Sequence, residues 1–121
     1  MDQNVNPVLY IFVNTDLKLR MGRTAAQVAH VTHIITDTIV RDIYENMPLP
    51  EYCYRYLQWC KKPTTVILRA TTTELLELLK LSESLPFYDN LESNHSNLEL
   101  TVVGMYPQLP SKHDFSSFKL L

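Results

Sequence analysis

The feature that most restricts the fold of this chain is a continuous apolar run near its start, at residues 8–13. The run consists of β-branched, aromatic and leucine side chains with no polar residue among them. A half-exposed strand would alternate apolar with polar residues, whereas a strand covered on both faces is apolar throughout. Such strands occur where helices pack on both sides of a sheet, so the run predicts an α/β fold.

A helical pattern follows this run. We expect a loop over residues 14–22 and then a helix, in which Thr24 and Gln27 form a capping box. Apolar residues recur along this helix at helical spacing and predict its buried face. They are Ala25, Val28, Val31 or Thr32, Ile35 and Ile39.

The remaining segments complete a layered fold. Prolines within residues 47–50 separate the first helix from a shorter, aromatic-rich helix over residues 51–59. A third helix begins at Thr72 or Thr73 and carries a face of leucines. Further strands are predicted at 64–69, 86–88 and 98–104, followed by a short, loosely patterned tail. Alternating strands and helices predict a three-layer sandwich in which helices enclose a four-stranded mixed, mainly parallel sheet, in one domain spanning residues 1–121.

Length and composition exclude several classes of protein. A chain of 121 residues with 45% apolar and 20% charged residues is typical of one globular core. No apolar stretch approaches the ~20 residues that span a bilayer, and the first residues lack a basic, apolar leader. We therefore expect a soluble, cytoplasmic protein.

On one helix, Cys53 and Cys60 are too far apart for a disulfide, which predicts two buried free thiols.

The net charge of the chain restricts RNA binding to local clusters of basic residues. A formal net charge of −2 excludes a surface that is basic throughout, so an RNA contact must be local. One local cluster consists of Lys18, Arg20 and Arg23, and a second is the pair Lys61 and Lys62.

The sequence does not support a bound metal or nucleotide cofactor. Its only two glycines, Gly22 and Gly104, are too few for the glycine-rich loops that bind phosphates. The cysteine spacing lacks the C-x-x-C pattern of structural zinc sites. His30, His33 and Asp37 share a helical facet, but such spacings are common by chance. We therefore predict no metal and no cofactor.

A polar stripe on the first helix marks a candidate site. Arg23, Gln27 and His30 follow one another at steps of four and three, which places them on one helical face. In open α/β sheets, ligands bind at the carboxyl ends of strands. The loop of residues 14–22 and Asp89 both follow predicted strands, so they and the stripe together predict a pocket.

The motifs at this pocket resemble those of a known family. Thr15-Asp-Leu-Lys18, followed by Gly22-Arg-Thr-Ala-Ala-Gln27 and His30, matches the pattern T-D-L-K-x-x-x-G-K-x-A-A-Q-x-x-H without a gap. The family's D-A-G-x-T and T-V-L-G-x-x-P fall on residues 89–93 and 101–107. These patterns belong to the archaeal and eukaryotic type of peptidyl-tRNA hydrolase, which the chain resembles over residues 8–107. The segment Tyr56-Leu-Gln-Trp is similar to a divergent branch that lacks part of the catalytic set.

The resemblance implies hydrolysis of the ester between a peptide and the 3′ ribose of tRNA. That reaction needs an activated water, a donor for the oxyanion and a proton for the leaving ribose oxygen. The resemblance implies that Asp89 orients or deprotonates the water and that His30 is an acid–base or polarising group. Arg23, at a family lysine, would stabilise the oxyanion or hold a terminal phosphate. Ser93 and Thr101 would supply hydroxyl hydrogen bonds.

The resemblance also implies how tRNA is held. Lys18 and Arg20 would grip the acceptor-stem backbone, because phosphate contacts position a nucleic acid independently of its sequence. Gln27 would be a further substrate-binding residue. Sheets of this family pair into dimers, so a homodimer that binds peptidyl-tRNA is implied.

Two alternatives remain open at this stage. Arg23 replaces a lysine and cannot donate a proton at neutral pH, and Leu91 replaces the glycine of D-A-G. The stretch after Pro107 is also shorter than usual, so a covering helix is expected to be missing. These departures fit a relative that has lost catalysis and binds RNA or a protein through the same surface. A small-molecule enzyme on the same fold is the other alternative.

Overall fold

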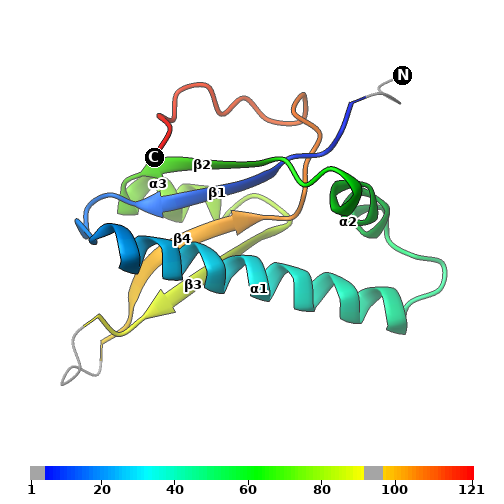
Figure 1. Cartoon of the computed structure of the whole chain (residues 1–121), viewed down its shortest axis with the longest axis horizontal. Coiled ribbons are helices and arrows are strands. Elements are labelled where there is room, and N and C mark those ends of the chain that lie inside the picture. Colours follow the sequence, from blue (N-terminus) through cyan, green and yellow to red (C-terminus); the bar gives the residue numbers. More distant parts are fainter. Residues whose placement is uncertain (1–4, 92–96) are drawn as a thin grey trace.

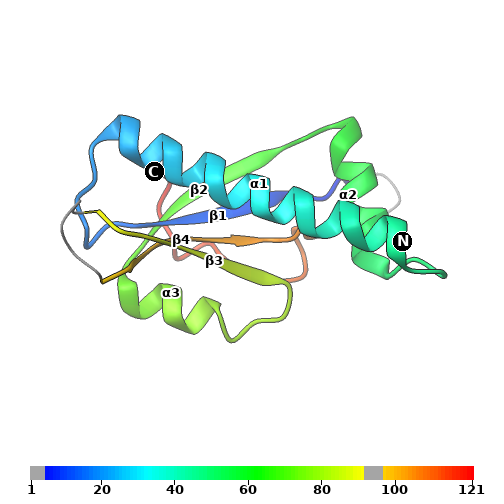
Figure 2. The ribbon, with the colours of Figure 1, turned by 90° about the horizontal axis from the view of Figure 1, so that it is seen from below.

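The chain folds into three layers around one sheet, as the computed structural model shows for residues 5–91 and 97–121. The strands lie in the order β2-β1-β4-β3. Figures 1 and 2 show α1 and α2 on one side of the sheet and α3 on the other. The predicted three-layer α/β fold is confirmed. The elements are β1 (Leu9–Asn14), α1 (Met21–Glu45), α2 (Glu51–Lys61), β2 (Thr65–Ala70), α3 (Thr72–Leu78), β3 (Ser84–Asp89) and β4 (Glu99–Met105).

The strand directions refine the prediction of a mainly parallel sheet. β1, β2 and β3 run the same way, but β4 lies between β1 and β3 and is antiparallel to both. Only the pair β1–β2 is therefore a parallel pair of neighbours. Residues 90–98 connect β3 to β4 in sequence, and the two strands pair antiparallel. The alternation of strands with helices holds only as far as β3.

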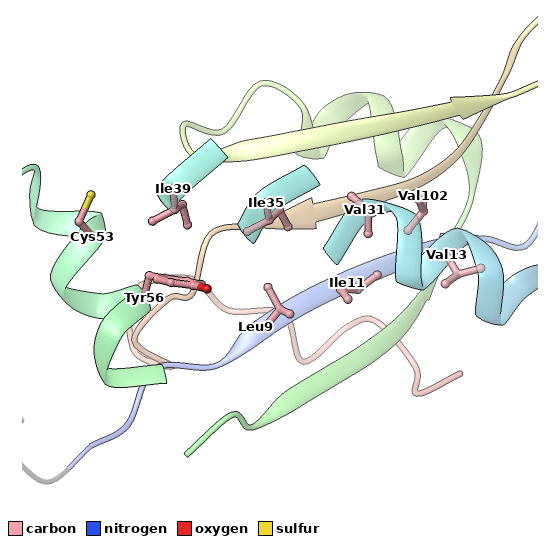
Figure 3. Packing of buried hydrophobic residues seen from close by; sticks show 9 residues of the cluster. All are labelled: Leu9, Ile11, Val13, Val31, Ile35, Ile39, Cys53, Tyr56 and Val102. Atoms are coloured by element: carbon pink, nitrogen blue, oxygen red, sulfur yellow. The ribbon is translucent and has the colours of Figure 1, made fainter. Parts of the chain in front are cut away.

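The first layer of the core lies between α1, α2 and the sheet. Ile35 and its apolar neighbours on α1 pack against β1 and β4, and α2 closes the far end of this cluster (Figure 3). Burying each such side chain stabilises the fold by about 1.5–3 kcal/mol. Gly104 of β4 allows this close approach, because a Cβ there would lie 2.6 Å from Ile35 Cδ1. The cluster consists of Leu9, Ile11, Val13, Val31, Ile35, Ile39, Cys53, Tyr56 and Val102.

The opposite face is covered partly by a helix and partly by the C-terminal segment. α3 contributes Leu75 and Leu78, while Phe115 and Phe118 pack edge-on against Phe12 with ring centroids 5.0 Å apart. The tail also adds an antiparallel bridge to the edge of β2, which pairs residues 68 and 120. The sequence analysis expected a covering helix to be missing after Pro107. In the structure the C-terminal tail covers the sheet beside α3 with Phe115 and Phe118.

Four local predictions were wrong. α1 begins at Met21 and its N-terminus has no side-chain cap, so Thr24 and Gln27 form no capping box; both lie within the helix and face the sheet. Ala25 is exposed instead of buried. The N-cap of α3 is Thr71, which forms a capping box with Glu74. Cys53 and Cys60 are free as predicted, but Cys60 is exposed instead of buried.

An ionic network closes the end of the sheet where β3 begins. Arg55 of α2, whose side chain is only 10% exposed, donates to Glu51 and to both carboxylate oxygens of Glu83, each at 2.8 Å. It also donates to the Pro107 carbonyl, and Gln108 donates to Glu83 at 2.7 Å. These groups satisfy one another and tie α2 to the start of β3 and the end of β4, which lie at the same end of the sheet.

Candidate active site

A chain of hydrogen bonds joins three elements at the other end of the sheet. Thr101 of β4 donates to Gln27 Oε1 at 2.8 Å, and Gln27 Nε2 of α1 donates to Asp89 Oδ2 at 2.9 Å. Gln27 and Thr101 are 1% and 0% exposed, so water does not compete for these bonds. Because Gln27 Oε1 accepts the hydroxyl proton, its amide nitrogen must face Asp89. The carboxylate is thus held in one orientation at the end of β3.

A β-bulge places Thr101 on the correct face. Phe87 pairs with Val102 and Tyr88 pairs with Leu100, so Thr101 has no backbone pairing partner on β3, although its hydroxyl lies 3.2 Å from the Phe87 carbonyl oxygen. Leu100 packs in the core on the α3 side and Val102 on the α1 side. Regular alternation would turn Thr101 toward α3, but the extra residue turns it toward α1 and Gln27. Bulges often re-aim side chains beside functional sites.

The other two residues of the predicted stripe flank Gln27 on α1. His30 is exposed and stacks on the Phe87 ring, with ring centroids 4.8 Å apart and an interplanar angle of 23°. The part of the chain that the structure describes provides no hydrogen-bond partner for its imidazole. Arg23 is exposed one turn before Gln27 and forms no ion pair with any described residue.

A hollow of about 450 Å³ lies beside Asp89 and contains Arg23 in its wall. Leu91, which replaces the family glycine, also lines the hollow and is half-buried. Leu91 is not among the described residues with positive φ, so no backbone strain results from the leucine at this position. The full lining is Asp16, Leu17, Leu19, Arg23, Asn90, Leu91, Asn97 and Glu99. The hollow thus brings one cation, Arg23, and two carboxylates, Asp16 and Glu99, to the end of the strand that carries the oriented Asp89.

A comparison of the sequence with protein families assigns the chain. The model described as peptidyl-tRNA hydrolase PTH2 matches residues 7–115 of the 121. The chain belongs to the PTH2 family. No individual curated protein matches the sequence significantly. The family indicates a hydrolase that acts on peptidyl-tRNA in translation, and the resemblance seen in the motifs is thereby confirmed.

Two of the remaining predicted residues, Lys18 and Arg20, take no part in the hydrogen-bonded chain of this PTH2 site. Lys18 and Arg20 are exposed on the β1–α1 loop, where Lys18 adopts a φ of 50°. Ser93 lies outside the described residues. Membership in the PTH2 family does not test these residues, and their roles stay predictions.

Asn14 is a residue of the PTH2 site that the sequence analysis missed. It is 3% exposed, and its Nδ2 donates to the Leu100 carbonyl at 2.8 Å and to Thr72 Oγ1 at 2.9 Å. Its Oδ1 accepts from the Asp16 amide, and Asp16 accepts from the Thr72 amide, both at 2.9 Å. Asn14 thus ties the β1–α1 loop to β4 and α3. The sequence signal that could have identified it is an asparagine directly after the apolar run of residues 8–13.

Within residues 5–91 and 97–121, no three His, Cys, Asp or Glu side chains are arranged to bind a metal ion. None of the described helices is both long and apolar enough to cross a bilayer.

Proposed function

We propose that this protein hydrolyses the ester between a peptide, or an N-blocked amino acid, and the 3′ ribose of tRNA, and so releases tRNA for reuse. The observation that carries the proposal is the buried chain from Thr101 through Gln27 to Asp89. It orients a carboxylate whose other oxygen accepts no hydrogen bond from the described residues. Membership in the PTH2 family supports the substrate class.

Asp89 has the central chemical role in this proposal. As the water oxygen bonds to the ester carbonyl carbon, Asp89 takes up a proton from the water, which makes the water a better nucleophile. The resulting tetrahedral oxyanion then expels the ribose oxygen. Arg23 cannot supply the proton that this oxygen needs, because its guanidinium stays charged at neutral pH. Asp89 returns the proton it has gained, so the products are a free acid and a ribose hydroxyl.

The other residues assist this step. Arg23 stabilises the oxyanion or holds the terminal phosphate, since it is the cation in the wall of the hollow. His30 is the further acid–base or polarising group, and Ser93 supplies a hydroxyl. Gln27 and Thr101 are positioning residues in this proposal, because they are buried and act through Asp89.

The proposal includes how and where the protein meets its substrate. Lys18 and Arg20, which are exposed on the loop beside the hollow, contact the acceptor-stem phosphates. The reaction takes place in the cytoplasm, where translation produces peptidyl-tRNA. As the family resemblance implies, the protein acts as a homodimer.

Single-turnover hydrolysis of an N-blocked aminoacyl-tRNA tests the proposal. We expect Asp89→Ala to lower the rate by at least about 10³-fold, because both the base and the proton donor are lost. Circular dichroism should show that the variant remains folded. Asp37→Ala is the matched control, since Asp37 is an exposed carboxylate elsewhere on α1 that pairs with Arg41. Equal rates for wild type and Asp89→Ala would remove Asp89 from the mechanism.

The same experiment tests the alternative of a binding protein without catalysis. Leu91 in the wall of the hollow is the observation that favours this alternative, because a leucine occupies space that a glycine leaves open. If wild type binds tRNA but releases no product, Leu91→Gly should be measured next. Turnover gained by this variant would show that the leucine blocks the substrate.

A further inference from the structure

Two cations face each other on the side of the β1–α1 loop that is remote from Asp89. The amide of Arg69 in β2 donates to the carbonyl of Lys119 in the C-terminal segment at 2.8 Å. The antiparallel bridge between Leu68 and Leu120 sets the same register. Residues directly opposite each other in an antiparallel pair project to the same face. The Arg69 and Lys119 side chains therefore lie next to each other.

The charges of this pair are not neutralised within the described residues. Both side chains are exposed, and neither forms an ion pair or a side-chain hydrogen bond with another described residue. The carboxylate of Glu74, which lines the same hollow of about 300 Å³, instead accepts from the Thr71 amide. Like charges directly opposite each other destabilise a sheet. The arrangement is therefore suited to an anionic ligand.

Arg69 also lies along the loop that leads to the candidate active site. One hollow contains Arg69 together with Lys119 and Thr15, the first residue of the loop. A second hollow contains Arg69 together with Leu19 and Met21, where the loop enters α1. Figure 1 shows the C-terminal end next to β2, on the same side of the molecule as this loop. The basic pair thus continues the surface formed by the loop.

The end of the sheet that carries Asp89 holds several cations, together with the carboxylates of Asp16, Glu74 and Glu99. β2 and β3 are its two edge strands, so the basic pair lies at one edge and Asp89 at the other. Three strand spacings of about 4.8 Å separate the edges, which is about 14 Å. Of the 11 Lys and Arg residues in the chain, this end holds Lys18, Arg20, Arg23, Arg69 and Lys119.

We propose that Arg69 and Lys119 bind backbone phosphates of the tRNA acceptor stem, an inference that rests on the proposed function. A guanidinium and an ammonium group are both suited to phosphate oxygens, and two adjacent cations can bind successive charges of a nucleic-acid backbone. The pair lies the width of the sheet, about 14 Å, from Asp89, so it lies beyond the nucleotide that carries the ester. The pair therefore contacts the stem and not the reacting end.

Binding measurements with tRNA that carries no amino acid or peptide test the proposal without requiring turnover. We expect the double variant Arg69→Ala with Lys119→Ala to reduce the slope of log K against log salt by about 2. The matched control is Lys80→Ala with Lys112→Ala, which removes the same charge from exposed positions near the end of the sheet where β3 begins and should leave the slope unchanged. A slope equal to that of wild type in the Arg69 and Lys119 variant would overturn the proposal.

A second comparison separates stem binding from binding of the 3′ end. The double variant should bind an RNA hairpin that carries the acceptor stem about tenfold more weakly, but a three-nucleotide 3′ fragment as tightly as wild type does. Equal losses for both RNAs would overturn the assignment to the stem. If the wild type fails to hydrolyse its substrate but the double variant still shows these losses of binding relative to the wild type, the proposed function alone would be refuted.

Substitution Arg69→Glu adds a test that involves protein stability. It places opposite charges across from each other, so the melting temperature should stay the same or rise. Affinity for tRNA should nevertheless fall. Unchanged affinity would overturn the proposal, because the lost cation would then have no phosphate to bind.

Discussion

The two ends of the sheet use buried polar groups in different ways. Where β3 begins, the Arg55 guanidinium donates to two carboxylates and a backbone carbonyl, and Gln108 donates to one of the same carboxylates. Where β3 ends, the chain from Thr101 through Gln27 stops at Asp89, and exposed cations surround it. The first network satisfies itself and links elements of the fold. The second network leads from the core to a carboxylate that can act on another molecule.

This difference gives a criterion for separating structural from functional polar clusters. Arg55 has partners for the whole of its guanidinium fork, so no ligand is needed to compensate its burial. Asp89, Arg23 and the pair Arg69–Lys119 keep groups for which the described residues offer no partner. Three substitutions test whether the two ends differ in this way.

Arg55→Met should have the largest effect on stability and none on chemistry. Methionine retains much of the aliphatic stem but leaves the half-buried Glu83 carboxylate without its counter-ion, with only Gln108 still donating to it. We expect the free energy of unfolding in urea to fall by about 1–3 kcal/mol, because the remaining carboxylates are partly exposed. The rate per folded molecule should not change. Arg41→Met is the control, because the exposed pair Arg41–Asp37 contributes less than about 1 kcal/mol. Equal costs for the two variants would show that the network is not structural.

Gln27→Glu should affect the chemistry at the end of the sheet where β3 ends, because it changes the amide that donates to Asp89. A carboxylate would then face Asp89 at hydrogen-bond distance, and two such groups share a proton at neutral pH. We expect the acid limb of the pH–rate profile to move about one unit higher and kcat at pH 7 to fall by roughly tenfold or more. A change in stability with an unmoved pH profile would contradict the positioning role. Gln58→Glu on α2 makes the same change far from the site and should leave the profile as it is.

Tyr52 of α2 provides a smaller test at the end of the sheet where β3 begins. Its hydroxyl donates to Asp42 at 2.6 Å, and this bond, together with burial, raises the pKa of Tyr52 well above its ordinary value of 10. Above pH 10 the tyrosine ionises in the unfolded chain before it does so in the folded one. Stability present below pH 10 is therefore lost as the pH rises further.

Urea unfolding at pH 8 and pH 11 measures this loss. Tyr52→Phe should show a weaker decline than wild type, because the group whose pKa differs between the folded and unfolded states is gone. Tyr54→Phe replaces an exposed tyrosine on the same helix and should behave as wild type does. Identical declines in all three proteins would show that Tyr52 does not account for the effect.

The sequence predicted the elements better than the contacts between them. Apolar runs and helical spacing located the strands and helices, because those patterns depend on neighbouring residues. The direction of β4 depends on which strand it joins, and no local pattern encodes that choice. Thr101 was expected at the site only through the family motif. Its orientation depends on a bulge that breaks the alternation from which faces are predicted.

The predicted site residues show the same division. Arg23, Gln27 and His30 were placed on one helical face from their spacing, and the structure brings them beside β3. Spacing could not show that Gln27 is buried, because an amide is equally common on surfaces. Arg69 and Lys119 are fifty positions apart in sequence, and only the pairing of the tail with β2 brings them together.

The absence of a side chain at residue 104 links the interior of the protein to its chemistry. α1 is a rigid rod of 25 residues that rests on β4 at this point, and two turns away it carries the amide that orients Asp89. A methyl group at position 104 would lie 2.6 Å from Ile35 Cδ1 and 3.1 Å from Val31 Cγ2, so these side chains of α1 would have to move. A residue in the core, remote from Asp89, thus constrains the helix that carries Gln27.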